Sequence, residues 1–501
     1  MILPSAPALR QRDSVKGGKA MRRWAIVTSL SLVCVSLFLP WPLSAAPSLT
    51  PRAQLYLPLI LKGSAPPTTP TPTMMPTPSA TPGAHCADSE PPFITDFQVC
   101  PIPSRAEPAP RIYFRDPTFG RCLVRVTDRE HDLDPDDSSA GLVNEYSRVQ
   151  SFNADESRIL VRGIQATWYL YDAATLRPLE WLRQVEVEPR GDATNPDLLY
   201  YFTGTSLMAY DVRLGQAALV HDFAADFPGQ NLAAVWTRWE GSPSLDSRTW
   251  GLMAQDEDWN VVAFLIYDLQ TDRVIAKRAL PDRPSVDSVT ISPLGNYFLA
   301  YYDEYCEQGH LGDDAHPCGL MVYDRNLANG RSLLRIVGHS DTALDAQGRE
   351  VLVYQDIDTD HISMLDLATG VVTPLRPIDF SHSSIGLHFS GRAFRRPGWV
   401  LVSTYNGARP TSATWMDDQV FAVELRAGGH VVRLAHTHSL YDEDIEQDYW
   451  AEPHATVNRD FTRVLFTSNW GRSGTEETEM YLIELPADWP SWLQGTAKST
   501  H

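Results

Sequence analysis

One pattern recurs seven times along this chain: two or more apolar residues are followed by an acid that closes a strand. The seven acids are Asp172, Asp211, Asp268, Asp324, Asp366, Glu424 and Glu484, and neighbouring members lie 39 to 60 residues apart. Repeats of this length, built from several short strands without helical periodicity, are typical of β-propeller blades. The pattern therefore predicts an all-β chain with seven blades.

A second apolar strand precedes each acid-terminated strand. These strands begin at Arg158, Leu198, Trp250, Tyr297, Glu350, Trp399 and Arg463. Each unit thus offers an inner strand, a turn, a second strand, a loop and a third strand. We predict a single seven-bladed β-propeller over residues 109–488. Two sandwiches or a β-solenoid would need a different spacing.

Closure of the ring can also be argued from the sequence. After Glu484 the chain reads LPADWPSWLQGTAKSTH, and its two prolines oppose a further strand. We therefore expect residues 489–501 to form a C-terminal tail. The missing outer strand can come from residues 111–128, which precede the first unit and would pair with the open edge of the last blade.

The N-terminal part has the features of an export signal. Arg22 and Arg23 precede an apolar run over 24–39, and small residues follow at 44–46. We predict a signal peptide or anchor over residues 1–46, with Met21 as a candidate true start. Residues 47–108 then form a short apolar segment, a Pro/Thr-rich linker and a lead-in. We therefore expect a secreted, monomeric protein that is attached to a membrane only if the N-terminal anchor is not cleaved.

The cysteines fit an oxidising compartment. Cys34 falls in the signal, and five remain, so at most two disulfides form and one thiol stays free. We predict a Cys306–Cys318 disulfide, with Cys86–Cys100 as the next pair. A metal knot formed by Cys306, His310, His316 and Cys318 is the alternative, but its spacing matches no zinc pattern.

The formal net charge is −20. An acidic surface of this size repels phosphate backbones, which argues against nucleic acid as a partner. It also disfavours acidic polymers unless a local basic patch overrides the overall field.

Polar residues that open the units converge at the axis of a propeller. They are Glu145, Tyr146, Arg148 and Gln150 in unit 1, His339 and Asp341 in unit 5, His388 and Arg392 in unit 6, and Glu452 and His454 in unit 7. Three neutral imidazoles on one rim, those of His339, His388 and His454, can bind Zn²⁺ or Mn²⁺. Asp341 or Glu452 would then be a ligand or would orient one. The alternative is that these histidines are hydrogen-bonded on a polar channel wall. We expect His382, His430, His436 and His438 on the surface.

The units over residues 110–485 resemble the WD40-like propellers of secreted bacterial proteins. Within that group, the stretch EPHATVNRDFTRVLFTSNWG (452–471) is similar to the histidine-bearing blade of propeller-type polysaccharide lyases of the oligogalacturonate- and ulvan-lyase-like kind. That resemblance implies cleavage of uronate-containing chains by β-elimination. It also implies, for some members, a divalent metal held by channel histidines.

Two functions remain open. The first is an extracellular propeller that binds a glycan or a protein through its His/Arg/Tyr face, with Glu145, Gln150, Asp341 and Glu452 as binding residues. The alternative is a metal-assisted lyase, in which Arg148 or Arg392 pairs with the uronate carboxylate and His388 or Tyr146 removes the proton. The sequence contains no nucleophile elbow with a Ser-His-Asp order and no Gly-rich phosphate loop, so it does not support a hydrolase or a nucleotide-binding protein.

Overall fold

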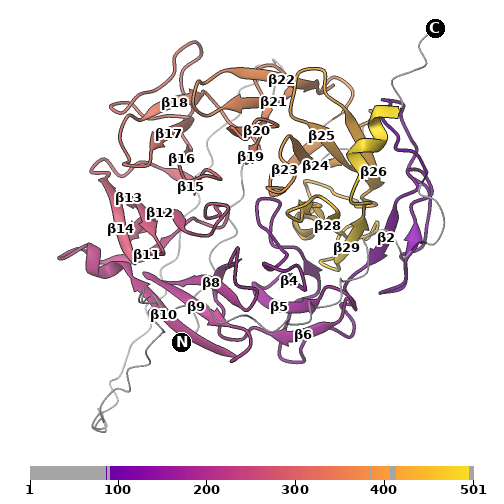
Figure 1. Ribbon diagram of the computed structural model, residues 1–501, viewed down its shortest axis with the longest axis horizontal. Helices are drawn as coiled ribbons and strands as arrows, with labels where there is room; N and C mark the ends of the chain where they lie inside the picture. The colour runs from indigo at the N-terminus through magenta and orange to yellow at the C-terminus, as the bar shows by residue number, and fades with distance from the viewer. Residues whose placement is uncertain (1–85, 87–90, 384, 407–412, 496–501) are drawn as a thin grey trace, which may run out of the picture. The chain divides into compact units, whose positions relative to one another are not determined.

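The computed structural model describes residues 86, 91–383, 385–406 and 413–495. Within these residues, seven antiparallel sheets surround one axis as the blades of a β-propeller (Figure 1). This confirms the predicted fold class. The predicted signal or anchor and the Pro/Thr-rich linker lie outside the described residues. In the part of the chain that is described, no helix is long and apolar enough to cross a membrane.

Each blade begins with a strand near the axis. These innermost strands are β3 (Leu142–Val143), β7 (Val187–Gly191), β11 (Leu232–Trp236), β15 (Val286–Ile291), β19 (Ser340–Leu344), β23 (Ile385–Ser390) and β27 (Thr456–Val457), in blades 1 to 7. The second strands are β4 (Arg158–Gly163), β8 (Leu198–Thr203), β12 (Thr249–Asp256), β16 (Tyr297–Tyr302), β20 (Glu350–Asp356), β24 (Trp399–Asn406) and β28 (Arg463–Ser468). They coincide with the second apolar strand that the repeat predicts in each unit.

The third strands carry the repeated acids. They are β5 (Thr167–Asp172), β9 (Ser206–Asp211), β13 (Val261–Asp268), β17 (Leu320–Asp324), β21 (His361–Asp366), β25 (Gln419–Glu424) and β29 (Glu479–Glu484). The outer strands of blades 1 to 6 are β6 (Pro178–Trp181), β10 (Gln216–Asp222), β14 (Arg273–Ala279), β18 (Arg331–Leu334), β22 (Val372–Pro377) and β26 (Val431–His436). Three short 3₁₀ helices complete the described elements: η1 (Phe223–Asp226), η2 (Glu446–Ala451) and η3 (Trp489–Gly495).

The acid at the end of a third strand fixes the turn that follows it. Asp172 Oδ1 accepts the backbone N–H groups of Ala174 and Thr175 at 3.1 and 2.7 Å. Asp366 Oδ1 accepts those of Ala368 and Thr369 at 3.0 and 2.8 Å in the same way. A carboxylate that satisfies turn donors stabilises a tight hairpin, so the recurring acid has a structural cause.

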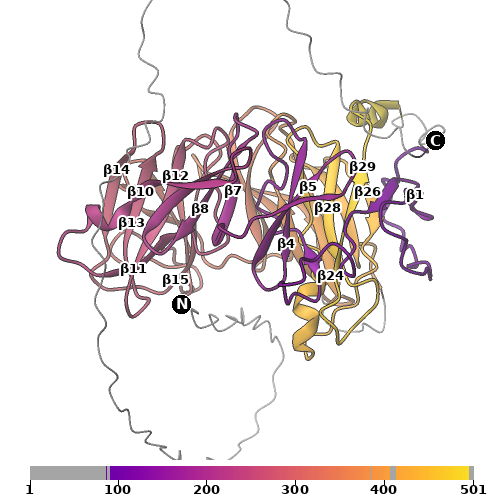
Figure 2. The ribbon, with the colours of Figure 1, turned by 90° about the horizontal axis from the view of Figure 1, so that it is seen from below.

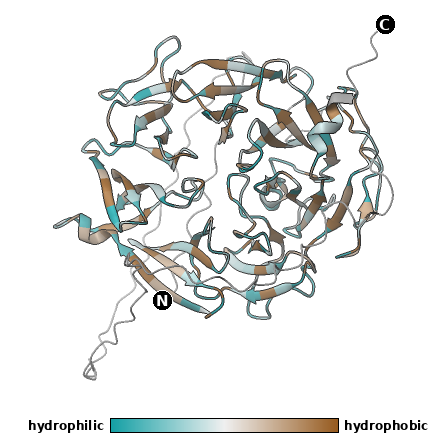
Figure 3. Ribbon diagram, in the orientation of Figure 1, coloured by the Kyte–Doolittle hydropathy of each residue, from teal (hydrophilic) through white to brown (hydrophobic). Residues whose placement is uncertain are grey.

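Both faces of the inner blade strands are buried. In β20 the side chain of Val353 packs in one core with Val400 of blade 6, while its neighbour Leu352 packs with Leu299 of blade 4. Successive side chains of a strand point to opposite faces, so each blade is held between its two neighbours. Figure 3 accordingly shows hydrophobic residues concentrated along the strands.

The N-terminal strands close the ring, as predicted. β2 (Cys122–Arg125) pairs antiparallel with β29, placing Leu123 opposite Ile483 and Val124 opposite Leu482. β1 (Phe114–Arg115) adds a further strand outside β2, so blade 7 has the order β1-β2-β29-β28-β27 (Figures 1 and 2). The strands from the two ends of the chain thereby remove an open edge.

The lead-in and the C-terminal segment also pack against the propeller. Phe93 is buried, and its ring centroid lies 5.9 Å from that of Trp489 and 5.7 Å from that of Trp492 in η3. Ile94 pairs with Arg433 of β26. The expected tail therefore begins with a helix whose Trp489 is buried in the core that blades 6 and 7 share.

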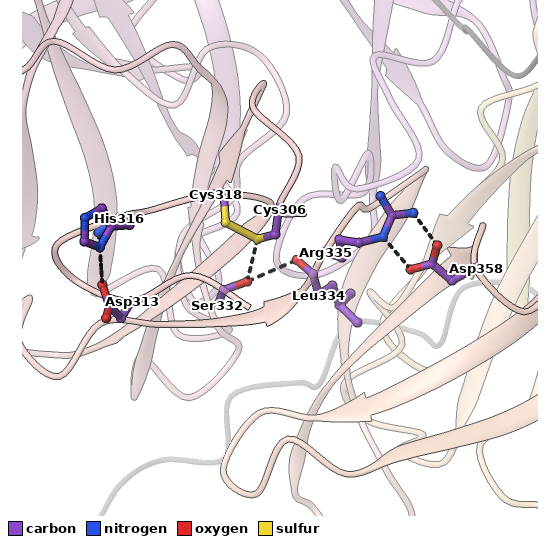
Figure 4. Close-up of a disulfide and its surroundings, with 8 residues drawn as sticks. All are labelled: Cys306, Asp313, His316, Cys318, Ser332, Leu334, Arg335 and Asp358. Atoms are coloured by element: carbon purple, nitrogen blue, oxygen red, sulfur yellow. Dashed lines mark hydrogen bonds and ion pairs between the residues drawn. A yellow bond between two sulfur atoms is a disulfide. The ribbon is translucent and has the colours of Figure 1, made fainter. Parts of the chain in front are cut away.

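The Cys306–Cys318 disulfide is present, as predicted, in the loop before β17 (Figure 4). Cys306 contacts Ser332 of β18, and His316, nearby, is exposed and paired with Asp313. The disulfide excludes the alternative metal knot, because its two sulfurs are bonded to each other.

The predicted Cys86–Cys100 pair is wrong. Cys86 is bonded to Cys122 at the start of β2, and Cys100 is the free cysteine among the described residues. The reason lies in the path of the lead-in. Its pairing with Arg433 directs it along β26, and the Arg433 guanidinium donates a 2.7 Å hydrogen bond to the carbonyl of Gln98, close to Cys100.

Candidate metal centre

Four residues from three adjacent blades meet at the axis. His388 lies within β23, His339 immediately precedes β19, and Glu452 and His454 lie between η2 and β27. Glu452 and His454 are fixed by their backbone: Thr467 N–H donates to Pro453 O at 2.9 Å, and Asn144 Nδ2 donates to His454 O at 2.5 Å. His454 has a φ of +41°, a strained conformation for a non-glycine residue.

Glu452 lies between the two imidazoles. Its Oε2 atom is 2.8 Å from His388 Nε2 and 3.3 Å from His454 Nε2. The ring centroids of His388 and His454 are 4.2 Å apart in an edge-to-face arrangement. All three residues are buried: His388 is 1% exposed, Glu452 7% and His454 8%.

The surroundings set the protonation states. Burial alone would raise the pKa of Glu452, but hydrogen bonds from His388 and His454 outweigh burial and leave that pKa below its ordinary value. Burial, together with the neighbouring His454 and His339, lowers the pKa of His388 well below its ordinary value. The group at neutral pH therefore contains an ionised carboxylate beside a neutral imidazole, the forms that bind metals.

The geometry fits a divalent cation. One ligand atom from each of His388, Glu452 and His454 lies within 4.8 Å of the other two. Two atoms that each lie ~2.1 Å from one ion, with an angle of roughly 85–105° between them, are about 2.8–3.3 Å apart, and the two carboxylate–imidazole distances match this. Two imidazoles and a carboxylate suit Zn²⁺ or Mn²⁺. His388, Glu452 and His454 are called the axial triad below.

His339 and Tyr146 border the axial triad. The His339 ring stacks on that of His388, with centroids 4.3 Å apart and planes 18° apart. Its Nδ1 atom lies 2.5 Å from the carbonyl oxygen of Leu387. The Tyr146 ring centroid is 4.9 Å from that of His454 and 5.6 Å from that of His388. The three predicted histidines and Tyr146 are thus brought together, with Glu452 among them.

Both predicted arginines are already paired. Arg392 makes a bidentate contact with Asp341, with Nε–Oδ2 at 3.0 Å and Nη2–Oδ1 at 2.6 Å, and both side chains are buried. Arg148 Nη1 lies 2.9 Å from Glu240 Oε2. The charge of each guanidinium is therefore already balanced by an acidic side chain.

Glu145 and Gln150, the other two predicted binding residues, form their contacts with residues outside the axial triad. Glu145 forms a buried ion pair with Arg190 at 3.3 Å. Gln150 donates to Val457 O at 3.1 Å and lines a small pocket of about 40 Å³ with Arg190 and Arg392. These contacts are structural, joining blades 1, 2 and 7.

Several axial residues were not predicted. Tyr405, at the end of β24, stacks on His388 with centroids 5.4 Å apart. Glu240 follows β11, and Tyr301 lies in β16 beneath the Arg148 guanidinium at 5.1 Å. Glu240 follows the innermost strand of its blade, as Tyr146 follows β3, so comparing that segment across all seven units would have found it. Tyr405 belongs to a second strand and has no such signal.

Two of the remaining histidines are not on the surface. His436 ends β26 and is completely buried. His438 is half-buried, and its ring stacks on Trp470 with centroids 4.2 Å apart. The surface prediction for this pair was wrong because other aromatic side chains cover the two rings. Phe119, in the turn between β1 and β2, lies against His436 with centroids 4.9 Å apart, and Trp470 covers His438.

By fold and site the chain is a seven-bladed β-propeller with a buried His/Glu/His group at its axis. No protein-family model matches it, and a search of curated proteins found no relative. Among solved structures, it is similar to an oligogalacturonate lyase in complex with manganese, with 16% identity over 75% of this chain and 96% of that one (TM-score 0.49).

Two further solved structures are similar in the same way. An oligogalacturonate lyase from Vibrio parahaemolyticus is 12% identical over 75% of this chain and 97% of its own (TM-score 0.49). The hydrazine synthase of Kuenenia stuttgartiensis is 12% identical over 71% and 100% (TM-score 0.42). Similarity of this extent does not transfer an activity to this chain.

Proposed function

We propose that the propeller is a metal-dependent lyase that cleaves uronate-containing polysaccharide by β-elimination at the axial triad. The observation that carries the proposal is the convergence of one ionised carboxylate and two imidazoles within 4.8 Å of one another. His388, Glu452 and His454 would hold the ion. When bound, a divalent cation would neutralise the uronate carboxylate and so acidify the adjacent C–H group.

Two flanking side chains are placed for the proton transfers. His339 donates its Nδ1–H to Leu387 O, so its Nε2 atom is the nitrogen left to accept the proton from C5. Burial, and then the charge of Glu240, raise the pKa of Tyr146 well above its ordinary value. Tyr146 is therefore a protonated phenol at neutral pH, able to donate to the departing glycosidic oxygen.

The electron balance of the reaction is simple. The C5–H electron pair forms the C4–C5 double bond as the C4–O bond breaks, and the leaving oxygen takes the phenolic proton. His388, which the sequence offered as a base, is instead tied to Glu452 and almost inaccessible. That leaves His339 as the base and His388 as a ligand.

A binding propeller without catalysis is the second candidate, and one observation favours it. Arg148 and Arg392, the predicted partners of the uronate carboxylate, are both engaged by acidic side chains. Without a metal ion, a uronate carboxylate would then have to share these two guanidinium groups with Glu240 and Asp341.

The deciding experiment measures ultraviolet absorbance of the unsaturated product on pectate, ulvan and related chains. The metal-stripped protein is assayed before and after addition of Mn²⁺ or Zn²⁺, beside the His388→Ala variant. We expect product only with metal, and none from the variant. If the protein binds one of the polymers but forms no unsaturated product with or without added metal, the lyase is rejected and the binding function is supported.

A further inference from the structure

A contiguous series of aromatic side chains leads from the axial triad toward blade 3. Each member contacts the next through two rings or through a guanidinium and a ring. We call the series, which consists of five aromatic residues and one arginine, the aromatic track: Tyr449, Trp450, Arg162, Trp239, Trp236 and Trp259. Trp450 stands two residues before Glu452. One end of the track therefore lies next in sequence to the proposed metal centre.

The steps along the track are short and regular. The centroids of Tyr449 and Trp450 lie 5.2 Å apart. The Arg162 guanidinium lies 5.1 Å from both the Trp450 and the Trp239 rings and joins them. Trp236 follows at 6.1 Å from Trp239, and Trp259 at 6.2 Å from Trp236.

The two ends of the track are open to solvent. Tyr449 is 53% exposed and Trp259 is 58% exposed, while the indoles between them are half-buried. Large aromatic residues are usually buried in the core or at an interface. The exposed rings at both ends, connected by partly exposed ones, therefore have the character of a binding surface.

The protein fixes these rings in place. Trp236 Nε1 donates to Gln255 Oε1 at 2.6 Å, and Gln255 Nε2 donates to the carbonyl of Trp259 at 2.8 Å. Trp239 and Trp259 have φ values of +75° and +63°, which are rare for large side chains. Strain of this kind is retained where the surrounding structure over-determines a position, often at functional sites.

The charges beside the track restrict what it can bind. Glu257 and Asp258 precede Trp259, and Glu443, Asp444 and Glu446 precede Tyr449; all five are exposed. An indole or phenol ring packs well against the C–H face of a sugar, but exposed carboxylates repel a charged one. The carboxylates near the two ends therefore favour uncharged sugars on the exposed rings of Tyr449 and Trp259, while the one charged member of the track, Arg162, lies between them.

We propose that the aromatic track binds the neutral sugars of a heteropolysaccharide in which uronate and uncharged residues alternate, while a uronate enters the axial triad. This inference rests on the proposed function and narrows its substrate class. A homopolymer of uronate would place carboxylates next to the acidic borders of the track and is a poorer ligand.

Affinity electrophoresis tests the track without requiring turnover. Gels contain either an unsulfated rhamnogalacturonan backbone, in which galacturonate alternates with rhamnose, or polygalacturonate. Trp259→Ala and Tyr449→Ala should each weaken rhamnogalacturonan binding roughly three- to tenfold, and wild type should prefer it to polygalacturonate. Tyr305→Ala is the matched control, because Tyr305 is 51% exposed but lies in the loop of the Cys306–Cys318 disulfide.

Three outcomes would overturn the proposal: no retardation of wild type by rhamnogalacturonan, equal or stronger retardation by polygalacturonate, or a Trp259→Ala/Tyr449→Ala double variant retarded like wild type. Circular dichroism verifies that the variants are folded. The proposed lyase activity can be rejected or supported independently of the aromatic track. Retardation that depends on the track, with no unsaturated product from any polymer, would reject the lyase and support the track. Unsaturated product formed by a double variant whose retardation is unaltered would support the lyase and reject the track.

Discussion

Glu452 Oε2 lies 2.8 Å from His388 Nε2, and the Nδ1 atom of the same imidazole has no hydrogen-bond partner among the described residues. Glu452 therefore provides the hydrogen bond that orients the most deeply buried histidine of the axial triad, whose ring also stacks on His339 and Tyr405. A buried imidazole with one unsatisfied nitrogen is costly, so the contact of its other nitrogen with Glu452 matters more to the placement of the ring. The relationship makes Glu452 the most informative position to change.

Replacing Glu452 with Gln should remove the charge that the ion needs while keeping the shape of the side chain. We expect the affinity for Zn²⁺ or Mn²⁺ to fall by roughly 100-fold or more, measured by isothermal titration calorimetry on the metal-stripped protein. Glu446→Gln, the same change on the exposed start of η2, should leave affinity unaltered. Equal affinities for the two variants would contradict a metal centre at the triad.

The ring closure predicts a second result. Val124 of β2 is completely buried and lies opposite Leu482 of β29. Val124→Asp would bury an unpaired carboxylate in the strand that closes the propeller, costing about 3–5 kcal/mol of unfolding free energy. Thermal unfolding should show a large loss of Tm together with aggregation. Ile112→Asp, at a 62% exposed position just before β1, is the control and should unfold like wild type.

The blade pattern was predictable because its cause is local. Asp172 and Asp366 each cap the turn directly after their own strand, so the same acid recurs wherever that turn does. The convergence of His388 and His454 was predictable for a similar reason, since both stand at the innermost strand of a blade.

What could not be predicted depends on contacts between distant segments. Arg392 and Asp341 were both expected to face a ligand, yet they are 51 residues apart in sequence and neutralise each other. The Cys86–Cys122 disulfide likewise depends on the path of the lead-in along β26. Sequence spacing indicates which residues approach the axis, but not which of them pair there.

Acid should destabilise the propeller through His436. Burial, and then the charges of His438 and Arg433, lower the pKa of His436 to about 4, whereas in the unfolded chain it is about 6.5. Between these values the unfolded chain binds a proton that the folded one does not. The unfolding free energy should therefore fall by up to about 3 kcal/mol as the pH drops from about 6.5 to about 4.

Urea unfolding at several pH values measures this contribution. In the His436→Asn variant the slope of unfolding free energy against pH should be smaller over that window. His316→Asn, at a side chain that is 89% exposed, should keep the slope of wild type. A variant at position 436 with the slope of wild type would show that the buried imidazole does not resist protonation.

The last prediction concerns the proposed acid. Tyr146 touches the rings of both His388 and His454, and its raised pKa keeps its proton in place at neutral pH. Tyr146→Phe preserves the ring contacts and removes only the hydroxyl group. If that group protonates the leaving oxygen, kcat on the cleaved polymer should fall by about 100-fold or more, while KM and metal affinity change little. Tyr305→Phe should have no effect, and a Tyr146→Phe enzyme of normal kcat would assign the proton to another donor.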